Sequence, residues 1–210
     1  MLEVFTIGHS TQPIERFVSL LKRHEISAIA DVRSAPYSRH NPQFNRETLR
    51  SSLTHESISY VFLGKELGAR SDDECCYVHN KVSYQRLAET DLFKAGIKRV
   101  IDGALSYRVA LMCAEKDPLD CHRTILVARE LAKDDVKVTH ILQSGTLESH
   151  DAAISRLVEQ LGIGGEDMFR PQEEVVQLAY ERQAQLIAYD RGASPTRGFG
   201  TVADERGSVR

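Results

Sequence analysis

The sequence contains no long apolar run and no basic leader at its start. No stretch approaches the ~20 consecutive apolar residues that a membrane-spanning helix requires. Residues 1–8 lack the positive charge and apolar core of a signal peptide, and their pattern is typical of a strand instead. These absences predict a cytoplasmic protein that makes no contact with membranes.

Positive charge is not in excess either. The formal net charge is −3 and the sequence pI is about 6.2, so no overall field attracts nucleic acid. Four arginines lie close in sequence to Tyr37 and Phe44, whose rings are suited to stacking on bases. They are Arg33, Arg39, Arg46 and Arg50. This patch is either an ordinary mixed-charge surface or the contact surface of a nucleic-acid-binding module.

Cysteine is scarce, with four residues in all: Cys75, Cys76, Cys113 and Cys121. Thiols stay reduced in the cytoplasm, so we interpret these as buried thiols, metal ligands or reactive groups. Cys75 and Cys76 are adjacent and close to His79, but this is not the spacing of structural zinc, and no second ligand pair is near. The chain also lacks the compact array of cysteines that holds an iron–sulfur cluster.

The apolar pattern alternates between short strand-like runs and helical spacing. We expect strands over residues 3–7, 28–32, 58–63, 108–112 and 136–142. We expect helices over residues 13–21, 46–56, 82–104, 124–133, 152–161 and 172–190. Such alternation predicts an α/β fold with a mostly parallel sheet of about five strands and helices on both faces, either doubly wound or loosely rhodanese-like.

The 210 residues, 41% of them hydrophobic and 27% charged, suffice for one domain with an ordinary core. We expect a single domain over residues 1–190, with a helical C-terminal part over about 150–190. Residues 191–210 scatter Gly, Ser and Pro among charges, which predicts a flexible tail.

Chemically active residues follow each expected strand. In an open parallel sheet, ligands bind at the carboxyl ends of the strands, so these residues predict a shared site. In chain order the strands are followed by His9 and Ser10, by Asp31 and Arg33, by Gly64 and Lys65, by Cys113 and Glu115, and by His140 and Gln143. Asp31 and Arg33 also admit a plainer interpretation, an ion pair that fixes the following loop.

The segment from Cys113 to Thr124 is the densest in reactive groups. A helix entrance presents free N–H groups and a partial positive charge, which together favour anions. This field, with His122 and Arg123 adjacent, should lower the pKa of Cys121 and make it a nucleophile or a metal ligand. The plainer alternatives are a buried, inert Cys113 and an ordinary helix start.

Several motifs together resemble the uncharacterised conserved family known as domain of unknown function 488. They are Gly8-His9-Ser10, Asp31-Val32-Arg33 followed by Pro36, Phe62-Leu63-Gly64, Leu111-Met112-Cys113-Ala114-Glu115 and Cys121-His122-Arg123. The resemblance covers about residues 3–145 and implies an α/β fold with the same site cluster, but no settled activity. A looser similarity links the strand–cysteine–loop–arginine order to rhodanese-like and cysteine-phosphatase loops.

The leading hypothesis is a thiolate-dependent enzyme that acts on a small anionic substrate, such as a phosphate- or nucleotide-like compound. Cys121 or Cys113 would be its nucleophile. The acid/base would be His122 or His9, oriented by Asp31. The substrate would be bound by Arg33, Arg123, Ser10 and Glu115, and Glu115 is also placed to carry a proton.

Two further hypotheses stay open. In the first, Cys113, Cys121 and His122, with His9, bind zinc or iron, because thiolate and imidazole suit both metals. In the second, the chain is a non-catalytic module that binds nucleic acid through residues 33–50.

Overall fold

The computed structural model describes residues 2–163 and 171–192, and its centre is a six-stranded sheet. The order across the sheet is β3 (Ser59–Phe62), β2 (Ala28–Asp31), β6 (Val109–Cys113), β1 (Glu3–Gly8), β7 (Lys137–Ile141) and β8 (Leu147–Ser149). The first five strands are parallel and β8 is antiparallel to β7. The predicted α/β fold is confirmed. The added strand β8 is three residues long, too short to show alternation in the sequence.

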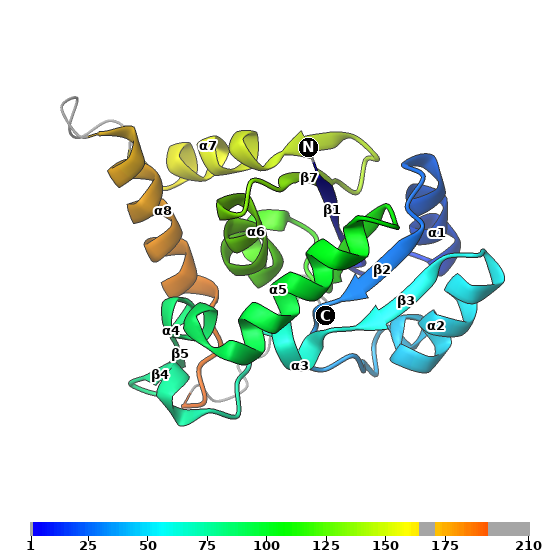
Figure 1. Ribbon diagram of the computed structural model, residues 1–210, viewed down its shortest axis with the longest axis horizontal. Coiled ribbons are helices and arrows are strands. Elements are labelled where there is room, and N and C mark those ends of the chain that lie inside the picture. Colours follow the sequence, from blue (N-terminus) through cyan, green and yellow to red (C-terminus); the bar gives the residue numbers. More distant parts are fainter. Residues whose placement is uncertain (1, 164–170, 193–210) are drawn as a thin grey trace, which may run out of the picture.

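Helices cover both faces of the sheet, as expected (Figure 1). One face carries α1 (Ile14–Arg23) and α2 (Arg46–His55). The other carries α5 (Asp91–Ala104), α6 (Arg129–Lys133), α7 (His150–Gln160) and α8 (Gln172–Ile187). Successive side chains of a strand point to opposite faces of the sheet. Ala28 and Ala30 therefore pack in the core under α5–α8, and Ile29 packs in the core under α1 and α2.

The expected helix over residues 82–104 is wrong at its start and in its continuity. Residues Lys81–Val82 form a short strand, β5, which pairs with β4 (Tyr77–Val78). Two helices follow, α4 (Tyr84–Glu89) and then α5. The hydroxyls of Ser83 and Thr90 accept hydrogen bonds from Arg86 and Phe93, so each caps the start of a helix.

The expected helix over residues 124–133 begins in another form. Residues Arg123–Ala128 are a π-helical segment, η4, and α6 continues from it. The segment before it is a 3₁₀ turn, η3 (Pro118–Asp120). Wide π turns of this kind are frequent at functional sites. Short helical turns also occur at η1 (Pro42–Phe44), α3 (Gly64–Leu67) and η2 (Glu74–Cys76).

The sheet order places a topological switch point between β1 and β6. These strands are neighbours, and Gly8 is paired with Cys113 at their carboxyl ends. The chain leaves β1 for α1 on one face and leaves β6 for η4 on the other. Such a point is where open α/β sheets bind ligands.

The expected tail and the expected absence of membrane contact can be compared with the structure only in part. Residues 193–210, most of the expected tail, lie outside the described residues. Within the described ranges, every helix is too short or too polar to cross a membrane.

Candidate functional site

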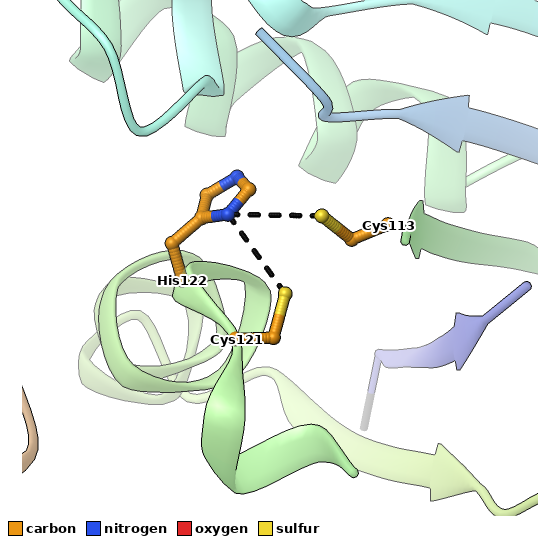
Figure 2. A group of neighbouring side chains, drawn as sticks. All are labelled: Cys113, Cys121 and His122. Atoms are coloured by element: carbon orange, nitrogen blue, oxygen red, sulfur yellow. Dashed lines mark hydrogen bonds between the residues drawn. The ribbon is translucent and has the colours of Figure 1, made fainter. Parts of the chain in front are cut away.

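Cys113, Cys121 and His122 form a compact buried cluster (Figure 2). Nδ1 of His122 lies 3.7 Å from Sγ of Cys113 and 3.8 Å from Sγ of Cys121. All three atoms lie within 4.8 Å of one another. Cys113 ends β6, whereas the other two residues follow η3, so the loop between them folds back on the strand it leaves.

The orientation of His122 is fixed from its far side. Its Nε2 lies 3.0 Å from the carbonyl oxygen of Val32, just beyond β2. A carbonyl only accepts hydrogen bonds, so Nε2 must carry the hydrogen. In the neutral ring Nδ1 therefore turns a lone pair toward the two sulfurs. Burial opposes protonation of His122, but the Cys121 thiolate outweighs it and raises the pKa of the imidazole.

The two cysteines differ in acidity. Burial raises the pKa of Cys113 well above its usual range. Burial acts on Cys121 in the same sense, but a hydrogen bond from Cys113 and the charges of Arg123 and His122 outweigh it. The pKa of Cys121 is therefore well below its usual range. The surroundings therefore shift Cys121 toward the thiolate and Cys113 toward the thiol.

Glu115 lies beside this sulfur, and Sγ of Cys121 donates to Oε2 of Glu115 at 2.9 Å. Burial, followed by the charge of Cys121, raises the pKa of the Glu115 carboxyl. A thiolate and a carboxylate this close repel each other strongly in a poorly hydrated site. Either a proton or a metal cation must therefore lie between them.

Arg123 is buried next to the cluster and contacts the loop that carries Glu115. It is 1% exposed, and its Nη1 donates to the backbone oxygen of Glu115 at 3.0 Å. Among the described residues no carboxylate pairs with it, and a buried guanidinium requires a nearby negative charge. Cys121 is a group that can supply that charge, since the positive charge of Arg123 lowers the pKa of its thiol. Substrate binding by Arg123 stays a prediction, and Arg123 is not among the residues that line the pocket described below.

Asp31 and Arg33 form a buried ion pair, the plainer of the two interpretations. Nε and Nη2 of Arg33 donate to the two carboxylate oxygens at 2.9 and 2.7 Å. Tyr60 donates its hydroxyl to the same carboxylate at 2.7 Å, and Arg33 also donates to the carbonyl of Phe44. Asp31 therefore orients Arg33, and among the described residues its carboxylate accepts no hydrogen bond from a histidine.

His9 contacts this ion pair through Arg33. Its Nδ1 lies 2.8 Å from the carbonyl of Ser10 and so carries the hydrogen, while Nε2 accepts from Arg33 at 3.2 Å. Burial lowers the pKa of His9 to about 4, so the ring is neutral. His9 and Ser10 both lie outside the pocket lining. They attach β1 to the loop after β6 through Ser10 N, which donates to Ala114 O.

In the basic segment 33–50, only part of the predicted nucleic-acid contact surface is exposed. Phe44 is fully buried and stacks on His9 with ring centroids 4.3 Å apart, so it is not free to stack on a base. Arg33 is buried as well, which leaves Tyr37, Arg39 and Arg50 exposed.

The Cys75–His79 segment makes no such cluster. Cys76 packs into the core and Cys75 is exposed. Among the described residues, the only group of three potential metal ligands is the one around His122.

A pocket of about 290 Å³ opens beside the cluster. Cys113, Glu115 and His122 line it, whereas Cys121 does not. The lining also includes Arg33, Arg70, Tyr84, Asp120, Ile187 and Tyr189. No local sequence pattern marks Arg70, Tyr84 or Tyr189 as pocket residues, because only the folded chain brings these three segments together.

Comparison with protein families matches residues 13–129 to the family described as Domain of unknown function DUF488, which covers more than half of the chain. The chain belongs to this family. Comparisons with curated proteins and with solved structures gave no match.

In this DUF488 member the family-matched region holds all three residues of the cluster. It is narrower than the expected 3–145, and it starts after Gly8-His9-Ser10. It also ends before α8, so Ile187 and Tyr189 of the pocket lie beyond it.

Proposed function

We propose that the protein is a metal-dependent enzyme whose zinc or iron ion is bound by Cys113, Cys121 and His122. Its substrate is a small anionic molecule bound in the adjoining pocket. The observation that carries the proposal is the convergence of two buried sulfurs and one imidazole lone pair within 4.8 Å.

The donor spacing fits a tetrahedral ion. Bonds of about 2.3 Å to sulfur and about 2.0 Å to nitrogen separate the two ligand atoms by about 3.5 Å. The distances here are 3.7 and 3.8 Å, so small side-chain shifts suffice. The bond from Nε2 of His122 to a carbonyl is also the contact by which proteins orient a metal-binding histidine.

The charges of the site support the same assignment. A divalent cation would ionise both thiols and would relieve the repulsion between Cys121 and Glu115. Thiolate with imidazole suits zinc and iron alike. Three protein ligands leave one position open, as catalytic sites do and structural zinc sites do not.

Glu115 is placed to move a proton at that open position. It lines the pocket, and burial raises the pKa of its carboxyl, which makes it a stronger base than an exposed carboxylate. A bound metal ion supplies acidity to a coordinated water or substrate hydroxyl. Glu115 would accept that proton.

A second candidate is a thiolate-dependent enzyme without metal. It is favoured by the lowered pKa of Cys121 beside the raised pKa of His122, the pattern of a thiolate–imidazolium pair. Its weakness is access, because Cys121 is 1% exposed and outside the pocket. Cys113, which lines the pocket, would have to react after passing its proton to Cys121.

Elemental analysis distinguishes the two candidates. Protein purified without oxygen and without a metal-affinity tag is expected to carry about one zinc or iron ion per chain. Cys113→Ser and Cys121→Ser should lose it, and Cys75→Ser, which changes an exposed thiol, should keep it. Metal-free wild-type protein with full activity would sink the metal proposal and favour the thiolate enzyme.

A further inference from the structure

Arg70 lies at the pocket over the ring of Tyr189. Its guanidinium carbon is 4.4 Å from the ring centroid, and both residues line the pocket. The backbone N–H of Arg70 donates to the hydroxyl of Ser34 at 3.0 Å, so its main chain is fixed to the loop after β2. Stacking on an aromatic ring holds an arginine in one orientation while leaving its N–H donors free.

The position of Tyr189 is also fixed, by backbone hydrogen bonds of its own segment. The N–H of Val82 donates to the carbonyl of Tyr189 at 2.9 Å, and Lys81 forms a β-bridge with Asp190. Arg191 then donates from its N–H to the carbonyl of Asn80. Figure 1 shows the segment after α8 beside β4 and β5. A stretch beyond the family-matched region is thus built into the wall of the pocket.

Arg70 differs in charge from the other arginine of the pocket. Arg33 is neutralised by Asp31 at 2.7 Å. No carboxylate pairs with Arg70 in the described part of the chain, so its charge is available to a ligand. The acidic groups of the pocket are Glu115 and Asp120, both of which follow β6.

We propose that Arg70, oriented by Tyr189, binds the carboxylate or phosphate group of the substrate. The body of that substrate is a small ring or chain lying against Ile187 and Tyr84. This inference rests on the proposed function in one respect, namely that the reacting group lies at Cys113 and His122. The volume of about 290 Å³ limits the ligand to a small metabolite.

Binding of simple probes tests the proposal by calorimetry on the full chain. Phenyl phosphate has both the ring and the anion, inorganic phosphate lacks the ring, and benzyl alcohol lacks the charge. Phenyl phosphate should bind wild-type protein at least about tenfold more tightly than Arg70→Gln, because charge-assisted hydrogen bonds are lost. It should also bind more tightly than inorganic phosphate. The variant should not alter benzyl alcohol binding.

Three further variants separate the effect of the Arg70 charge from that of the Tyr189 ring and from a general loss of positive charge. Arg50→Gln removes the same charge from an exposed position of α2 and should bind phenyl phosphate as wild type does. Tyr189→Phe keeps the ring and should retain the affinity, whereas Tyr189→Leu should lose severalfold. Equal affinity in wild type and Arg70→Gln, or no binding at millimolar phenyl phosphate, overturns the proposal. Parallel losses for phenyl phosphate and benzyl alcohol overturn it too, since they indicate a damaged wall.

Metal content measured on the same samples separates this proposal from the previous one. Arg70 is not a ligand of the cluster, so Arg70→Gln should carry metal as wild type does. Metal-free protein with Arg70-dependent binding would refute the metal centre alone. Metal-loaded protein without that dependence would refute the anion site alone.

Discussion

The carbonyl oxygen of Glu115 lies against Gly8, in the space that a Cβ at position 8 would occupy. The loop that leaves β6 can therefore rest on the end of β1 only because residue 8 has no side chain. The same carbonyl accepts the hydrogen bond from Arg123. The backbone of β1 thus determines how closely the loop with Glu115 approaches the end of the sheet, next to the cluster.

Gly8→Ala is expected to displace this loop. A backbone oxygen cannot yield as a flexible side chain does, so unfolding should become easier by about 1–3 kcal/mol, and metal content should fall. Urea unfolding and elemental analysis measure the two effects. Gly103→Ala is the matched control, because a Cβ there meets only Val109 at 3.9 Å. In helix α5 it should be neutral or slightly stabilising.

Asp31→Ala is expected to be severely destabilising. It leaves the buried guanidinium of Arg33 without a counter-charge, which costs about 3–5 kcal/mol in buried pairs. The comparison is Asp102→Ala, which breaks an exposed pair with Lys98 on α5 and should cost less than about 0.5 kcal/mol. The free energy of unfolding in urea gives both values. A small loss for Asp31→Ala would mean that the pair is not essential to the fold.

The sequence predicted the sheet, the strand ends and the cluster because these depend on local patterns. The continuous apolar run of β6 and the cysteines after it are visible in order along the chain. The roles of the charged groups were harder to predict. Arg33 follows a strand and Arg123 opens a helix, yet Arg33 pairs with the Asp31 carboxylate whereas Arg123 donates to the backbone carbonyl of Glu115, and only the folded structure shows this.

The wall of the pocket could not be predicted for a different reason. Arg70 and Tyr189 are separated by most of the chain, and neither belongs to a motif. Their meeting depends on the β4–β5 hairpin and on the path of α8. Such long-range pairings leave no periodic signal in the sequence.

The two cysteines of metal-free protein should differ in their pH profiles of alkylation. Cys121 should react slowly because it is 1% exposed, but the reaction should proceed below the ordinary thiol pKa of about 8.5, because Cys113, Arg123 and His122 stabilise the thiolate. Peptide mass spectrometry after iodoacetamide treatment at several pH values measures this. In His122→Ala the Cys121 profile should move to higher pH. An unchanged profile in that variant would remove His122 from the ionisation of Cys121.

Acid should destabilise the fold below about pH 6.5 because three buried histidines must stay neutral in it. Burial lowers the pKa of His9 and His150 to about 4, and it also lowers the pKa of His140 well below its usual range. An unfolded histidine titrates near 6.5, so between these values the unfolded chain binds more protons. The free energy of unfolding should fall toward pH 4 by up to about 1.4 kcal/mol per pH unit for each histidine. In urea unfolding at pH 5–7, His150→Asn should flatten this slope, and exposed His40→Asn should not.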